Sequence, residues 1–226
     1  MKAETLEAIL ADIGRKRPVV LATDLDSGDQ RLLHEGDGDT EAERADVARA
    51  LRVDACVTTD GDSAPQIFYQ PFNPPLRLIV VGAVHIAQPL SAIATLAGYE
   101  VTIVDPRESF AAAERFRGVT LSSEWPDAAL ESIGLDQRCA VVTLTHDPKL
   151  DDPALQVALR SDAFFIGCLG SRKTHASRLR RLSKAGFADA DLERVHGPVG
   201  LPIGSRSPAE IAVSVVAQVT QALRKP

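Results

Sequence analysis

From residue 76 onward, short apolar runs alternate with amphipathic helical segments. Residues 76–81 form a near-continuous apolar run, which is typical of a strand covered on both faces. Residues 99–104, 139–144 and 163–167 have the pattern of further strands, and an Ala-rich helix is expected over residues 85–97. Alternating strands and helices predict a parallel sheet with helices on its faces, so we expect a Rossmann-type α/β fold.

The last predicted helix has a clear start. Ser207 is placed as its N-cap, Pro208 at its first turn and Glu210 at the capping-box position. Its apolar face contains Ile211, Val215, Val219 and Leu223.

The first 75 residues show shorter and more varied patterns. They predict two helices at residues 3–13 and 41–51, a hairpin of strands at 18–23 and 30–34, and short strands at 55–58 and 66–69. Residues 71–75 contain three prolines, which we take to exclude helix and central strand and to mark a domain boundary. The expected organisation is a small acidic α+β domain at 1–75 and a Rossmann-like cofactor-binding domain at 76–226.

Composition favours a globular protein of the cytoplasm. Of 226 residues, 45% are hydrophobic and 25% charged, and no apolar stretch approaches the roughly 20 residues of a membrane span. The acidic, amphipathic start does not resemble a signal peptide. The three cysteines, Cys56, Cys139 and Cys168, lack metal-ligand spacing, so we expect buried small side chains and no cysteine-based metal site.

Charge is distributed unevenly along the chain. Residues 1–75 contain 8 Lys and Arg against 15 Asp and Glu, whereas residues 76–226 contain 17 against 16. A near-neutral second domain argues against nucleic-acid binding. The cations clustered from 172 to 184 fit a small anionic ligand. Within that cluster, Arg178, Arg180 and Arg181 are interpreted as a solvated helix face.

In open parallel sheets, ligands bind beyond the carboxyl ends of the strands. After 76–81 come Gly82 and His85, a glycine turn into a helix N-terminus that favours phosphate. Val84 stands where a dinucleotide fingerprint has its second glycine, so NAD pyrophosphate is a weaker prediction. A tight turn without any ligand is the alternative interpretation.

Polar residues follow the next two strands as well. Asp105 stands where a ribose hydroxyl is usually held, and Arg107 is a candidate phosphate contact; alternatively Asp105 caps a turn. His146 and Asp147 follow 139–144 as general acid and base groups or as hydrogen-bonding groups for a ligand, unless they only form a turn before Pro148.

The segment after 163–167 is the best candidate for a second phosphate contact. Gly170 and Ser171 precede Arg172 and Lys173, so glycine, a hydroxyl and two cations enter a helix together. The Gly- and Pro-rich segment 196–204 is expected to be an irregular loop that closes over a ligand.

Six ordered blocks together resemble the xanthine dehydrogenase accessory factor family (XdhC/CoxI type), in a short-chain form. The blocks are residues 82–88, 104–107, 144–147, 166–172, 197–201 and 207–214. Unlike longer members of the family, the chain has no Gly-Gly-Cys element in residues 1–75. Many members have a glycine at the position of Val84, although short members can carry this Ala-Val-His form, and the family usually has an acidic residue where Pro202 stands.

This resemblance implies a chaperone that binds the molybdenum cofactor (molybdopterin) and inserts it into a molybdenum hydroxylase of the xanthine dehydrogenase type. It also implies a homodimer and contact with a cysteine desulfurase. No catalytic residue and no protein-held metal are predicted. The expected cofactor-binding residues are Gly82, His85, Asp105, Arg107, His146, Asp147, Gly170, Ser171, Arg172 and Lys173.

Two other classes of function remain open from the sequence. In an NAD(P)-dependent oxidoreductase, His146 and Asp147 would handle the proton, although the chain has no Tyr-x-x-x-Lys pair. In a nucleotide-sensing or scaffolding protein, the acidic domain would be the partner surface.

Overall fold

A computed structural model describes residues 2–59, 65–107 and 115–224 of the chain. The chain divides into two compact units, Met1–Pro74 and Pro75–Pro226. Within the described ranges, no helix is both long enough and apolar enough to cross a membrane.

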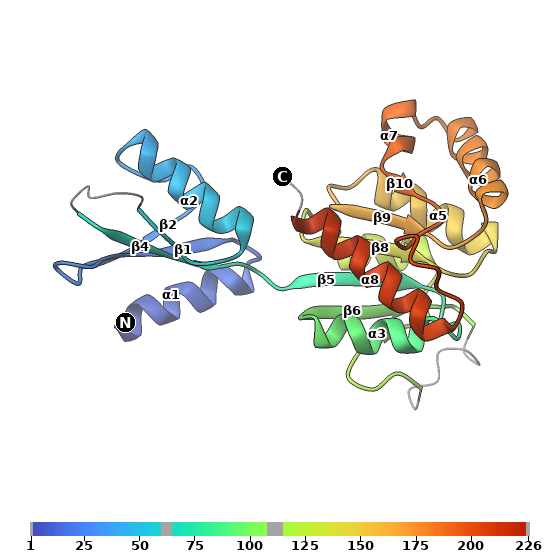
Figure 1. Ribbon diagram of the computed structural model, residues 1–226, viewed down its shortest axis with the longest axis horizontal. Helices are drawn as coiled ribbons and strands as arrows, with labels where there is room; N and C mark the ends of the chain where they lie inside the picture. Colours follow the sequence, from blue (N-terminus) through green and yellow to red (C-terminus); the bar gives the residue numbers. More distant parts are fainter. Residues whose placement is uncertain (1, 60–64, 108–114, 225–226) are drawn as a thin grey trace. The chain divides into compact units, whose positions relative to one another are not determined.

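The first unit is a small antiparallel sheet with a helix on each face (Figure 1). Its strand order is β2-β1-β4-β3, and Val20 and Ala22 of β1 pack with Val47 and Ala50 of α2 and with Tyr69. The elements are α1 (Ala3–Gly14), β1 (Val19–Asp24), β2 (Gln30–Leu33), α2 (Glu41–Val53), β3 (Val57–Thr58) and β4 (Ile67–Phe72).

The prediction that residues 71–75 exclude a central strand was wrong at its first two positions. β4 continues to Phe72, and Pro71 lies opposite Val20 of β1. On the other side, β3 pairs only with Phe68 and Tyr69. Pro71 is therefore at a locally unpaired edge, where its missing N–H costs no ladder hydrogen bond.

The second unit is a six-stranded parallel sheet of order β10-β9-β8-β5-β6-β7 with helices on both faces, which confirms the Rossmann-type fold. Its strands are β5 (Leu76–Val81), β6 (Tyr99–Val104), β7 (Thr120–Ser122), β8 (Cys139–Thr143), β9 (Phe165–Cys168) and β10 (Val195–His196). Its helices are α3 (Ala87–Leu96), α4 (Pro126–Ile133), α5 (Pro148–Leu159), α6 (Arg172–Lys184), α7 (Asp189–Glu193) and α8 (Pro208–Arg224).

Alternate side chains of the central strands enter two cores. Leu78 and Val80 of β5 face α3 and α8, whereas Ile79 and Val81 face α4, α5, α6 and α7. The run at 76–81 is almost entirely apolar because both faces of β5 are covered. Figure 1 shows α3 and α8 on the same side of the sheet.

β9 ends one residue later than the sequence pattern predicts. Gly167 lies inside the strand, where a Cβ atom would approach Val199 Cγ2 to 2.5 Å and Phe165 Cε1 to 2.8 Å. Glycine is therefore required at 167 for packing, and the turn that leaves the sheet begins only after Cys168. β7 and α4 were not predicted from the sequence.

Candidate functional site

The strand order changes direction between β5 and β8. The chain passes from β5 through β6 to β7 on one side, and then adds β8, β9 and β10 on the other. Ligands in open α/β sheets bind outside the carboxyl ends of the strands at such a point. Each residue predicted to bind cofactor follows the carboxyl end of β5, β6, β8 or β9.

Gly82 brings the turn after β5 against the loop after β8. Its φ is +111°, and a Cβ atom there would lie 2.6 Å from Thr145 Cγ2. Its N–H donates to the Val104 carbonyl at 2.8 Å. A larger residue would be strained and would also collide with Thr145, so this close approach requires glycine.

Asp105 is fully buried and bonded within the chain. Its Oδ2 accepts the Ala83 N–H at 2.8 Å, and its Oδ1 accepts the Arg107 N–H at 3.0 Å. The Arg107 side chain adds Nε to Oδ1 at 2.8 Å and Nη2 to Oδ2 at 2.7 Å. Burial acts to raise the pKa of Asp105, but these donors outweigh it and hold the pKa below its usual value. A ribose hydroxyl would have to compete with these four bonds.

Arg107 is 37% exposed and is oriented by the same carboxylate. The hydrogen bond from Arg107 to Asp105 raises the pKa of Arg107, and the negative charges of Asp147 and Asp151 raise it further. The positive charge of Arg107 is thus stabilised by the carboxylates that follow β8 as well as by the one that follows β6.

His85 is exposed and lies in the turn before α3, because that helix begins at Ala87 and not at residue 85 as the sequence pattern predicts. The N-cap residue Ile86 supplies no side-chain acceptor, and the first turn contains no acidic residue. The Ala87 and Leu90 N–H groups donate to the Val84 and Ile86 carbonyls, and Pro89 has no N–H, so the positive end of the helix dipole is what favours an anionic ligand here.

The loop after β8 is held by short side-chain bonds. Thr145 Oγ1 accepts the Asp147 N–H at 3.0 Å, and Asp147 Oδ1 accepts the Lys149 N–H at 2.9 Å as the N-cap of α5. Between them, His146 is exposed and has a φ of +63°, an uncommon conformation for a residue with a side chain. Such backbone strain is concentrated at binding and catalytic sites.

The turn after β9 ends in the N-terminus of α6. Ser171 is the N-cap, and its Oγ accepts the Thr174 N–H at 3.1 Å. Arg172 and Lys173 are exposed in the first turn, which contains no acidic residue. Two cations at the positive end of a helix dipole repel it, so this end of α6 favours an anion.

The loop after β8 and the turn after β9 lie next to each other. A Cβ atom at Gly170, whose φ is +142°, would lie 3.6 Å from His146 Nδ1. The structure therefore brings the exposed imidazole beside the cationic N-terminus of α6.

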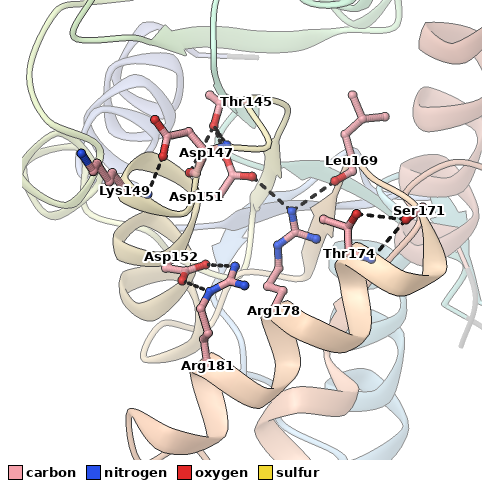
Figure 2. Close-up of polar contacts among 10 residues, drawn as sticks. All are labelled: Thr145, Asp147, Lys149, Asp151, Asp152, Leu169, Ser171, Thr174, Arg178 and Arg181. Carbon is pink, nitrogen blue, oxygen red and sulfur yellow. Dashed lines mark hydrogen bonds and ion pairs between the residues drawn. The ribbon is translucent and has the colours of Figure 1, made fainter.

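Sequence reasoning missed a buried ion pair beneath these turns (Figure 2). Arg178 and Asp151 are each only 1% exposed, and Arg178 Nη2 lies 3.1 Å from Asp151 Oδ2. The prediction that Arg178 belongs to a solvated face was wrong, because Arg178 lies on the inner stripe of α6, four residues before the buried Leu182. That spacing was the available sequence signal.

The other two cations interpreted as solvated, Arg180 and Arg181, differ from Arg178 and from each other. Arg181 Nε and Nη2 lie 2.5 Å and 2.9 Å from the carboxylate of Asp152, so Arg181 is a half-buried ion-pair partner and not a solvated cation. Arg180 is exposed, as predicted.

The cysteine prediction holds for two of three residues. Cys139 and Cys168 are buried, and burial raises the pKa of Cys168 to about 12. Cys56 is exposed, which contradicts the prediction, because β3 contributes only two residues to the edge of its sheet. Among the described residues, no group of three His, Cys, Asp or Glu side chains is arranged to hold a metal ion.

The doubly covered parallel sheet, with two helix N-termini suited to anions at its carboxyl edge, defines a Rossmann-type binding domain. The family model of the XdhC Rossmann domain matches residues 78–219. The chain belongs to this family, and the resemblance inferred from six sequence blocks is confirmed.

Two curated relatives are each 30% identical to the chain. The molybdenum cofactor insertion chaperone PaoD of Escherichia coli aligns over 148 residues, which is 66% of this chain and 40% of PaoD. A protein of Bacillus subtilis that is named as a probable xanthine dehydrogenase component aligns over 165 residues, which is 73% of this chain and 48% of that protein. The chain thus matches less than half the length of either relative.

A solved structure supports the fold. The crystal structure of a xanthine dehydrogenase from Bacillus halodurans matches with a TM-score of 0.74, covering 98% of this chain and 67% of that chain. The two are 23% identical, so the likeness shows the fold alone.

Proposed function

We propose that this protein binds the molybdenum cofactor and delivers it to a molybdenum hydroxylase of the xanthine dehydrogenase type. The observation that carries the proposal is the cationic N-terminus of α6 beside the β8 loop, at the carboxyl edge of the sheet in an XdhC Rossmann domain. The relative PaoD, a molybdenum cofactor insertion chaperone, suggests the ligand.

The chemistry of the donor set fits this cargo. Molybdopterin has a terminal phosphate, which requires N–H donors and positive charge. The α6 N-terminus offers both, with Arg172 and Lys173 in its first turn. The α3 N-terminus beyond Gly82 and His85 is a second place without an acidic residue or a side-chain cap. A cofactor extended by a nucleotide has a second phosphate for it.

The remaining predicted residues are given supporting roles. His146 and the backbone beside Gly170 are suited to hydrogen-bond the polar edge of a pterin. Asp105 and Arg107 are bonded to each other, so their role is to fix the turn at Ala83. None of these residues is assigned covalent chemistry.

The partners follow from the same proposal. The receiving enzyme is a xanthine dehydrogenase-type hydroxylase, and a cysteine desulfurase and a second copy of the chain complete the expected assembly. Delivery to such an enzyme would take place in the cytoplasm.

The competing function is NAD(P) binding, which the Rossmann fold makes the natural comparison. The intramolecular bonds of Asp105 oppose it, because that carboxylate is the group expected to hold the ribose. Val84 opposes it too, since it stands where the dinucleotide fingerprint has the glycine that lets the backbone approach the pyrophosphate.

The test is cofactor retention. The protein is incubated anaerobically with molybdopterin-bearing cofactor, and retained pterin and molybdenum are quantified with and without excess NAD(P)H. Stoichiometric retention that nicotinamide does not reduce is the expected result. Absence of retention together with saturable NAD(P)H binding would overturn the proposal.

A further inference from the structure

We propose that Arg178 and Asp151 are positioning residues that set the distance between the two turns of the ligand site. This inference rests on the proposed function for its ligand. It assigns the pair a role in affinity and not in the stability of the fold.

A continuous chain of bonds joins the two turns through this pair (Figure 2). Thr145 Oγ1, in the loop that presents His146, donates to Asp151 Oδ1 at 2.7 Å. Asp151 Oδ2 accepts from Arg178 Nη2 at 3.1 Å. The same Nη2 donates to the Leu169 carbonyl at 3.1 Å, one residue before Gly170.

Burying the Arg178–Asp151 ion pair costs free energy of folding. Both side chains are 1% exposed, and Arg178 uses one nitrogen for both of its bonds. Its Nε and Nη1 are buried and have no partner among the described residues. Replacing such a buried ion pair by apolar residues of similar volume often leaves the fold equally stable or makes it more stable. Stability therefore does not explain an ion pair here.

The geometry of the turns does explain it. His146 is held in a left-handed conformation, and its Nδ1 is 3.6 Å from the Cβ position of Gly170. A small movement of either turn would change the spacing between the imidazole and the α6 N-terminus. Bonds from Arg178 and Asp151 to both turns oppose such a movement.

The same two helices contain a natural control. Arg181 and Asp152 also join α6 to α5, with side chains 38% and 15% exposed. Within the described part of the chain, their hydrogen bonds connect only the two side chains and reach neither turn.

The experiment compares two matched double variants, Asp151→Leu/Arg178→Met and Asp152→Leu/Arg181→Met. For each, the urea midpoint and the affinity for molybdopterin-bearing cofactor are measured on the full chain. The first is expected to keep or raise its midpoint and to bind roughly tenfold to hundredfold more weakly, as when supporting partners of ligand-holding groups are removed. The second is expected to bind within about twofold of the native protein, since its bonds join only the two helices and reach neither turn.

A milder pair of variants separates positioning from packing. Thr145→Val removes the hydroxyl that bonds Asp151 and accepts the Asp147 N–H, whereas Thr145→Ser retains both bonds. Weaker binding by Thr145→Val together with native-like binding by Thr145→Ser is expected. Equal binding by both, or native affinity of the Asp151→Leu/Arg178→Met variant, would overturn the inference.

Hydrogen exchange distinguishes this inference from the proposed function. Without ligand, peptides covering 143–147 and 168–172 should exchange faster in the Asp151→Leu/Arg178→Met variant than in the native protein or the control variant. If the native protein retains no cofactor, the proposed function fails, but this local change still supports the positioning role. Unchanged exchange in these peptides would refute it.

Discussion

The two halves of the carboxyl edge use their polar residues differently. In the β5–β6 half, formed by Gly82, Asp105 and Arg107, the buried carboxylate bonds to its own chain. In the β8–β9 half, formed by His146, Arg172 and Lys173, the side chains are exposed. Gly82, Asp105 and Arg107 thus have the properties of a scaffold, whereas His146, Arg172 and Lys173 have those of a binding surface.

In the sequence, a position directly after a strand was the criterion for a site residue, and this criterion selected two kinds of residue. All of them follow strand ends, but only burial and hydrogen bonding separate the residues that shape the site from those left to meet a ligand. We therefore expect changes in the β5–β6 half to lower stability, and changes in the β8–β9 half to lower affinity in a folded protein.

Gly82→Ala should have the largest effect. The new Cβ would meet Thr145 Cγ2 at 2.6 Å at a φ of +111°, so overpacking and strain combine to cost about 4 kcal/mol of unfolding free energy. Gly98→Ala is the control, because its φ is +91° but nothing lies within 4 Å, and about 1 kcal/mol is expected. Equal losses in urea unfolding would show that Thr145 is not a constraint.

Asp105→Asn should lower the unfolding free energy by about 3 kcal/mol, because an amide cannot accept all the bonds from Ala83 and Arg107. The matched control is Asp147→Asn, which should change stability little in urea unfolding, since Asn caps helices as well as Asp.

The same carboxylate predicts a pH dependence. The folded pKa of Asp105 lies below its ordinary value of 3.8, so its contribution is complete above that pH and is lost as pH falls through the folded pKa. Unfolding free energy should therefore decline more steeply below about pH 4 in the native protein than in Asp105→Asn. Parallel acid profiles would contradict the assignment.

Arg172→Ala/Lys173→Ala should weaken binding of the phosphate-bearing cofactor about tenfold while leaving the fold intact. Stability should stay equal or rise by a few tenths of a kcal/mol, because two cations leave the positive end of α6. Arg180→Ala/Lys184→Ala removes the same charge elsewhere on this helix and should bind normally. Equal loss of affinity in both would indicate a general charge effect.

Ser171→Ala should have the smallest effect, a loss of about 1 kcal/mol from the missing cap of the Thr174 N–H. Ser177→Ala is the control within the same helix, where the hydroxyl accepts a bond from the Arg180 side chain and caps no backbone N–H of the described residues. Chemical denaturation measures both, and a neutral Ser171→Ala would show that the cap does not order the α6 turn.

Most of the large sheet could be predicted, because both faces of β5, β8 and β9 are covered and their apolar runs are unmistakable. The short β7 and the two-residue β10 were beyond sequence reasoning, since they depend on neighbouring strands for their pairing. The predicted strand ended at Gly167, one residue too early, because a glycine required for packing against Val199 looks the same in sequence as one that ends a strand.

The sequence by itself determined the α/β class, the change of pattern near residue 75, the strand ends that carry polar residues, and the family. Only the tertiary structure decided which of those residues are already bonded. It also revealed Arg178 and Asp151, which are 27 positions apart in the chain and 3.1 Å apart in space. Local patterns encode burial along one element, whereas a buried charge is explained only by its partner on another element.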